Sequence, residues 1–203
     1  YQAYLKGRFY WNKRTLDSTK IAIDYFQQAI KADPNFALAY VGLADCYIVA
    51  FGYQFMTADE ALSKAENAVQ KALELNNNLG EAHASHAYIE SFGFAHYEEA
   101  GREFAKAVEL NPNYATAHQW HSLYLAAMGR REEALREVKT AISLDPVSLI
   151  INSDAILVYY YVREYDLAME QCQKVLEMEP SFWITHIYKG LIYERKKMYQ
   201  EAI

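Results

Sequence analysis

The chain repeats one proline-containing phrase at a constant interval. Pro112, Pro146 and Pro180 lie 34 residues apart. Pro34 lies 78 residues before Pro112, which is two intervals of 34 plus ten further residues, and Asn77 occupies the proline position between them. A fixed interval of this length is typical of a repeat solenoid, in which each unit stacks on the next.

The residues before each proline position have the spacing of an amphipathic helix. In the unit that ends at Pro112, Ala100, Phe104, Ala107 and Val108 recur at i, i+4, i+7 and i+8. Small or apolar residues recur twelve, eight and five positions before the other proline positions: Ala22, Phe26 and Ala29; Ala65, Val69 and Ala72; Ala134, Val138 and Ala141; Ala168, Cys172 and Val175. We therefore predict one helix before each proline position.

A second helical pattern follows each proline, as with Leu43, Ala44 and Tyr47 after Pro34. Each unit is thus predicted to be a helical hairpin, with the proline in the connection to the next unit. Because proline cannot continue a helix but suits a first turn, we expect it to begin the following helix. The residues just before the prolines are expected to accept a bond from an unpaired backbone N–H of that turn: Asp33, Asn111, Asp145 and Glu179.

These positions resemble the tetratricopeptide repeat (TPR) family. That family has a large residue, a Leu and a small residue in the first helix, then Ala, an aromatic residue, Ala and Pro in the second. The second unit matches this pattern at Tyr40, Leu43, Ala44, Ala65 and Ala72. The resemblance implies an all-α, right-handed superhelical solenoid of antiparallel helix pairs with about five and a half repeats. It implies a single TPR array over 1–203, with units at approximately 1–36, 37–79, 80–114, 115–148 and 149–182 and a truncated unit at 183–203.

A narrower resemblance concerns longer proteins. The stretches YLKGRFYWNKRT and NPNYATAHQWHSLYLAAMGRREEAL are similar to repeat arrays of large bacterial regulators, which carry a winged-helix DNA-binding domain, a protein kinase or a cyclase elsewhere. The chain begins at Tyr1 without an initiator Met or a signal peptide, so we expect it to be a piece of a longer protein. The resemblance implies the regulatory arm of a signalling or transcription-regulator chain.

Charge argues against nucleic acid as a direct partner, and hydropathy argues against a membrane span. The net charge is -6 and Lys and Arg are scattered, which argues against direct binding of nucleic acid. The longest apolar run, residues 155–162, has eight residues, which is too short for a membrane span.

The chain has no recognisable catalytic motif. We find no phosphate-binding Gly motif, no CxxC, no nucleophile elbow and no HExxH, and therefore expect neither an enzyme nor a cofactor. Cys46 and Cys172 fall in units that are not neighbours, so both are expected to be buried free thiols. Free thiols favour a reducing compartment and a cytoplasmic location.

The second unit is 43 residues long, and its excess lies between its helices in IVAFGYQFMTADEALSK. Thr57 and Glu60 have capping-box spacing, which predicts a second helix from about Ala58 that is about a turn longer than usual. Aromatic and Met side chains in the connection either cover the hairpin's own end or form a contact patch at residues 51–56: Phe51, Tyr53, Phe55 and Met56. The fifth unit carries Ile156 where a small residue is expected, which predicts local repacking.

Two histidine pairs, His83 with His86 and His118 with His121, have HxxH spacing. Histidines three residues apart share a helix face, so the two pairs could form a metal or ligand sensor. Their positions are also those at which the first helix packs against its neighbours. We expect packing and no metal, and keep the sensor as an alternative function.

By resemblance to TPR proteins, a concave groove is lined by residues seven and eleven positions after each proline, with Tyr160 one turn further on: Val41, Asp45, Ala84, Tyr88, Gln119, Leu123, Ser153, Leu157, Ile187 and Leu191. The groove lacks the paired Lys and Asn residues that clamp a terminal carboxylate in some TPR domains. We expect a non-catalytic scaffold that binds the apolar side chains of a peptide or protein. The alternative partner is a second copy of the chain, bound through the open C-terminal end as a homodimer.

Overall fold

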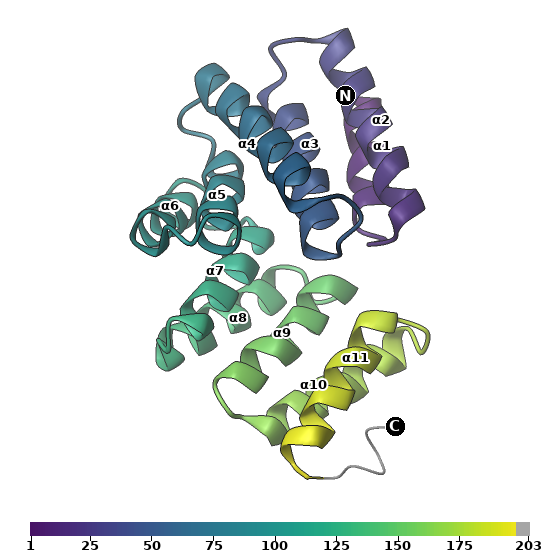
Figure 1. Ribbon diagram of the computed structural model, residues 1–203, viewed down its shortest axis with the longest axis vertical. Helices are drawn as coiled ribbons and strands as arrows, with labels where there is room; N and C mark the ends of the chain where they lie inside the picture. Colours follow the sequence, from purple (N-terminus) through teal and green to yellow (C-terminus); the bar gives the residue numbers. More distant parts are fainter. Residues whose placement is uncertain (198–203) are drawn as a thin grey trace. The chain divides into compact units, whose positions relative to one another are not determined.

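The computed structural model describes residues 1–197, and these residues form helices without any strand (Figure 1). A helix precedes each proline position and another follows it, as the spacing predicts. In chain order the helices are α1 (Gln2–Trp11), α2 (Leu16–Ala32), α3 (Ala37–Gly52), α4 (Ala58–Leu75), α5 (Gly80–Tyr88), the π-helix η1 (Ile89–Gly93), α6 (Tyr97–Leu110), α7 (Ala115–Ala127), α8 (Arg131–Leu144), α9 (Leu149–Tyr161), α10 (Tyr165–Met178) and α11 (Trp183–Arg195). The all-α hairpin architecture is confirmed.

The chain forms two compact units, Tyr1–Pro112 and Asn113–Ile203. In the first, the pairs α1/α2, α3/α4 and α5/α6 pack as hairpins, and the first helices α1, α3 and α5 contact one another in succession. In the second, α7/α8 and α9/α10 form hairpins, and α7, α9 and α11 follow one another in the same way. The single array over 1–203 stays a prediction. The second helix of the truncated sixth unit, with the open end suggested for dimers, falls on residues 198–203, outside the described residues.

The repeated small residues form the centre of each hairpin. All the alanines twelve residues before a proline position are fully buried: Ala22, Ala65, Ala100, Ala134 and Ala168. The larger residue four positions later is also buried in every hairpin, as with Phe26 and Phe104. Ile156 is fully buried in the position where a smaller side chain was expected. Small side chains let two helices approach, and the larger one fills the space between them.

The closest approach involves glycine. Phe26 on α2 places one edge of its ring, atoms Cδ1, Cε1 and Cζ, against Gly7 of α1 and Gly42 of α3. A Cβ atom added at Gly42 would lie 2.3 Å from Phe26 Cε1, and one added at Gly7 would lie 2.7 Å from it. Both glycines are therefore required for Phe26 to reach this position.

The prolines do not begin the following helices, and the prediction that they do is wrong. Pro34 lies in a turn, and α3 begins only at Ala37. The Asp33 carbonyl accepts a bond from Phe36 N at 3.1 Å, and Asp33 Oδ1 accepts one from Asn35 N at 3.0 Å. The proline thus takes the second position of a β-turn that its fixed φ suits, and the acidic residue stabilises that turn rather than a helix N-terminus.

The second unit's long helix begins at Ala58, as predicted, and α4 has 18 residues against 14 in α6, α8 and α10. Thr57 makes no side-chain cap bond, so the expected capping box is wrong. Asp59 and Glu60 lie instead in the first turn, where their charge suits the positive end of the helix dipole. A capping box is present in the first hairpin, between Thr15 and Ser18.

The two cysteines are buried free thiols, as predicted. Burial raises the pKa of Cys172 to about 11, and it raises the pKa of Cys46 further. None of the helices in residues 1–197 has the length and apolar character that a membrane crossing requires.

Candidate functional site

The predicted groove positions all lie on the first helices of the hairpins, but they differ in exposure. Six of the eleven are buried: Val41, Asp45, Ala84, Gln119, Leu123 and Ser153. The others are half-buried or exposed: Tyr88, Leu157, Tyr160, Ile187 and Leu191. A partner can reach the second set without any rearrangement of the hairpins.

Asp45 joins three first helices. Its Oδ2 accepts a bond from Arg8 Nη1 of α1 at 2.6 Å, and its Oδ1 accepts one from Ser85 Oγ of α5 at 2.6 Å. Its backbone carbonyl accepts a third bond from Trp11 Nε1 at 3.1 Å. Complete burial raises the pKa of Asp45, and the charge of Arg8 opposes this shift. Asp45 therefore holds α1, α3 and α5 together and is not available to a ligand.

Gln119 and Ser153 have the same kind of role in the second compact unit. Gln119 Nε2 on α7 donates to Asp154 Oδ2 on α9 at 2.6 Å, and Ser153 Oγ on α9 lies 3.2 Å from Thr185 Oγ1 on α11. At positions seven and eleven after a proline, short or polar side chains thus face the first helix of the next hairpin. A polar residue at these positions is the sequence signal for this role, so the prediction that Asp45, Gln119 and Ser153 line a groove open to a partner is wrong.

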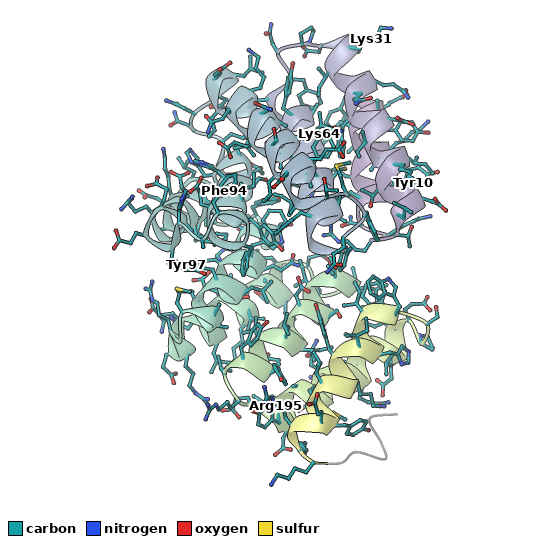
Figure 2. The ribbon with its side chains drawn as sticks, viewed as in Figure 1. Tyr10, Lys31, Lys64, Phe94, Tyr97 and Arg195 are labelled. Atoms are coloured by element: carbon teal, nitrogen blue, oxygen red, sulfur yellow. The ribbon has the colours of Figure 1, made fainter. Side chains whose placement is uncertain are left out.

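The exposed members gather on α9 and α11. Ile187, Leu191 and Arg195 are spaced at i, i+4 and i+8 on α11, so they share one helix face. Arg195 Nε donates to Tyr160 Oη of α9 at 2.8 Å, which places the end of that face beside Tyr160 (Arg195 is labelled in Figure 2). Leu157 precedes Tyr160 by about one turn of α9. We name these five residues the α9–α11 face. Ile187 is 52% exposed, which is high for a large apolar side chain.

The first compact unit exposes aromatic side chains near the end of α5. Tyr88 is half-buried, and its ring centroid lies 4.7 Å from that of Phe92. Phe92, Phe94 and Tyr97 are exposed around η1 and the start of α6 (Figure 2 labels Phe94 and Tyr97). In the α3–α4 connection, the predicted patch at residues 51–56 is half-buried at its apolar side chains, with the Tyr53 and Phe55 rings 5.7 Å apart. Its contact with a partner stays a prediction.

Each histidine pair shares one carboxylate of its own hairpin. His83 Nδ1 lies 2.5 Å and His86 Nδ1 lies 3.5 Å from Glu103 Oε2. His118 Nδ1 lies 2.6 Å and His121 Nδ1 lies 3.7 Å from Glu137 Oε2 in the other compact unit.

Burial alone would raise the pKa of Glu103 and of Glu137. Hydrogen bonds from His83 and His118, together with the closeness of His86 and His121, outweigh that effect and lower the pKa of each carboxyl to about 2. Both carboxyls are therefore ionised at neutral pH and hold the histidines of their hairpin in place.

Comparison with known proteins places this arrangement among TPR structures. No protein-family profile matches the sequence. The transcriptional regulator HilA of Salmonella typhimurium is 27% identical over 158 residues, which cover 78% of this chain and 28% of HilA. Human tetratricopeptide repeat protein 6 is 22% identical over 182 residues, covering 89% of this chain and 33% of that protein. The chain thus spans no more than about a third of the length of these relatives.

Solved structures agree on the fold. TTC0263, a TPR protein of Thermus thermophilus, superposes with a TM-score of 0.66 at 20% identity and covers 96% of this chain and 95% of its own. YrrB, a TPR protein with an unusual peptide-binding site, has a TM-score of 0.53 at 22% identity and covers 89% of this chain and 84% of its own. Human IFIT1, solved as a dimer with PPP-AAAA, has a TM-score of 0.72 at 17% identity and covers 93% of this chain and 44% of its own. The chain has the tetratricopeptide-repeat fold.

Proposed function

We propose that this chain is a non-catalytic scaffold that binds a peptide or protein through the exposed faces of its first helices. We further propose that it is the regulatory arm of a longer bacterial chain. Its similarity to a segment of HilA, a transcriptional regulator of which the match covers 28%, supports that placement. Its likeness to YrrB, whose peptide-binding site lies in a TPR fold, supports a peptide ligand.

The α9–α11 face carries the proposal. This face combines solvent-accessible apolar side chains with one positively charged residue, Arg195, at its edge. Apolar anchors supply most of the affinity in such contacts, and a peripheral charge selects the partner. An occupant that suits this face is a peptide with two or more large apolar side chains and a carboxylate beside them.

Ile187→Asp tests the proposal. Burial of an isoleucine side chain contributes about 1.5–3 kcal/mol, and a charge in its place adds a desolvation penalty. We expect the dissociation constant of a peptide selected from a display library against the wild-type chain to rise by about tenfold to a hundredfold.

The matched control is Leu167→Asp, the same kind of change at a residue of α10 that is 42% exposed. Both variants are expected to keep wild-type helicity by circular dichroism, since both side chains are exposed. Calorimetric titration compares the peptide affinities. Equal binding by wild type and Ile187→Asp, or equal loss in both variants, would exclude the α9–α11 face as the binding surface.

A further inference from the structure

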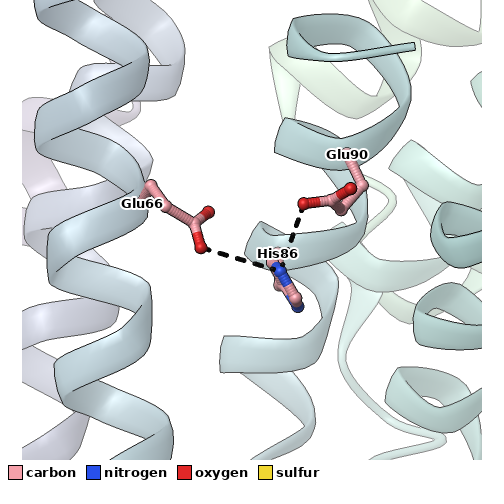
Figure 3. Close-up of side chains that lie close together, drawn as sticks. All are labelled: Glu66, His86 and Glu90. Atoms are coloured by element: carbon pink, nitrogen blue, oxygen red, sulfur yellow. Dashed lines mark ion pairs between the residues drawn. The ribbon is translucent and has the colours of Figure 1, made fainter. Parts of the chain in front are cut away.

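One nitrogen of His86 faces two carboxylates from different helices. His86 Nε2 on α5 lies 3.4 Å from Glu90 Oε1 of η1 and 3.8 Å from Glu66 Oε1 of α4 (Figure 3). Among the described residues, Glu66, His86 and Glu90 form a group that could hold a metal ion. Each offers one ligand atom, and the three atoms lie within 4.8 Å of one another. Glu90 follows His86 by four residues, so both point from the same side of the helix.

The distances are those of ligands around an ion rather than of hydrogen bonds. An N–H···O hydrogen bond has a donor–acceptor distance of about 2.7–3.2 Å, which both contacts exceed. Zinc binds nitrogen and carboxylate oxygen at about 2.0–2.2 Å in a tetrahedron, which separates neighbouring ligand atoms by about 3.4 Å. An ion between these three atoms therefore requires little movement of their side chains.

The surrounding contacts are those that metal ligands commonly have. Ligating histidines usually donate their second ring N–H to a carboxylate. Glu103 Oε2 faces His86 Nδ1 at 3.5 Å, which is longer than a hydrogen bond, and this buried nitrogen makes no hydrogen bond. Glu90 uses its other oxygen, Oε2, to contact His96 Nδ1 at 2.7 Å, which orients the carboxylate. Glu66 Oε1 accepts a bond from Gln70, while its buried Oε2 has no hydrogen-bond partner. Glu90 thus keeps Oε1 for an ion, and Glu66 can offer Oε2 in place of the Oε1 that accepts from Gln70.

The helix type changes between His86 and Glu90. The α-helix α5 ends at Tyr88, and the chain continues as the π-helix η1, in which Glu90 is the second residue. The Glu90 carbonyl accepts a bond from His96 N at 2.7 Å, which holds the chain around the site. Wider turns of this kind occur often at functional sites because they re-aim a side chain.

The next hairpin provides an internal comparison. His121 stands at the same distance from its proline as His86 does from Asn77, and it also shares a carboxylate, Glu137. At the repeat positions that correspond to Glu66 and Glu90, the chain has Gly101 on α6, in the preceding hairpin, and Leu125 on α7. Packing of the repeat therefore accounts for the histidine and its shared carboxylate, but it does not require Glu66 or Glu90.

We propose that Glu66, His86 and Glu90 bind one divalent transition-metal ion of the zinc class. Water completes the tetrahedron, because Glu66 and His86 are only partly buried. The ion joins α4, α5 and η1, so it stabilises the junction between the second and third hairpins. This proposal differs from an HxxH site, since His83 is held by Glu103 and by the carbonyl of Asn77. It does not depend on the peptide-binding function proposed above.

Zinc chloride titration by calorimetry, after treatment of the protein with a chelator, tests the proposal. We expect one zinc ion per chain and a rise in melting temperature, because a ligand that binds only the folded state stabilises it. Glu66→Gln, which keeps the side-chain shape, and His86→Ala are each expected to weaken zinc binding by at least about tenfold. His121→Ala is the matched control and is expected to bind zinc as the wild type does.

Cobalt provides a second measurement, since Co²⁺ in a tetrahedral site with N and O ligands absorbs strongly in the visible range. That band is expected in the wild type and in His121→Ala, and not in Glu66→Gln. Circular dichroism verifies that the variants are folded. Absence of zinc binding by the wild type, unchanged affinity in folded Glu66→Gln, or equal loss in His121→Ala would each overturn the proposal.

Discussion

Gly42→Ala provides the sharpest test of how the first two hairpins pack. In most helices this change is favourable, since alanine exceeds glycine in helix propensity by about 1 kcal/mol. Here the new methyl carbon would lie 2.3 Å from Phe26 Cε1, whereas carbon atoms in contact are about 3.5–4.0 Å apart. The ring or the helix must therefore move by at least about 1 Å.

Phe26 cannot make that movement cheaply. Its side chain is fully buried, and the same ring edge lies against Gly7 on α1. Overpacking costs about 1–3 kcal/mol. Because the overlap with Phe26 is severe, we take the upper end of that range, and the net loss after the gain of about 1 kcal/mol in helix propensity is about 2 kcal/mol. With a urea m-value of about 2 kcal/mol/M, the unfolding midpoint falls by about 1 M.

The control for Gly42→Ala is Gly52→Ala at the end of the same helix. A Cβ there would have Tyr88 Oη at 3.7 Å as its near neighbour, which is ordinary contact. We expect this variant to lie within about 0.5 kcal/mol of the wild type. Phe26→Leu combined with Gly42→Ala is expected to cost at least about 1 kcal/mol less than the sum of the single changes. A Gly42→Ala protein as stable as the Gly52→Ala protein would refute the close approach at Phe26.

Two further predictions concern buried charge. Asp45→Ala removes the carboxylate that accepts from Arg8 and Ser85 and is expected to lower the free energy of unfolding by about 3 kcal/mol in urea titrations. Wild-type stability of this variant would contradict the joining role of Asp45. The pKa of Glu137 is about 2 in the folded protein, below its unfolded value, so this carboxylate stabilises the fold above about pH 4.5 and its contribution is lost as the pH falls toward 2. Partial exposure limits that contribution to about 1–2 kcal/mol. The stability difference between the wild type and Glu137→Gln, followed by urea unfolding at several pH values, is therefore expected to shrink as the pH falls through that window, and a constant difference would refute the assignment.

Much of the fold was predictable because it depends on neighbours along the chain. The spacing of Ala100, Phe104 and Ala107 places them on one helix face, and repetition of that spacing in every unit identifies the same contact each time. The structure confirms the helices and the buried alanines. The turn at Pro34 was misassigned because a proline suits both the second position of a β-turn and the first turn of a helix, and only the hydrogen bonds of Asp33 distinguish them.

The candidate site was less predictable, since it depends on which helix covers a given position. Asp45 and Ile187 occupy related positions, yet Asp45 is buried between Arg8 and Ser85 while Ile187 is exposed. Nothing in the residues around Asp45 records that Arg8, 37 positions away, supplies its counter-charge. The approach of Glu66 to His86 likewise needs α4 to lie beside α5 and η1.

By itself the sequence determined the helices, the repeat and the small residues at the helix crossings, because local periodicity and steric size set these. Only the tertiary structure decided which polar side chains join neighbouring helices, which apolar ones remain open to a partner, and which carboxylates meet at His86. Those outcomes depend on contacts between residues far apart in the chain, whose distances are set by how the hairpins pack.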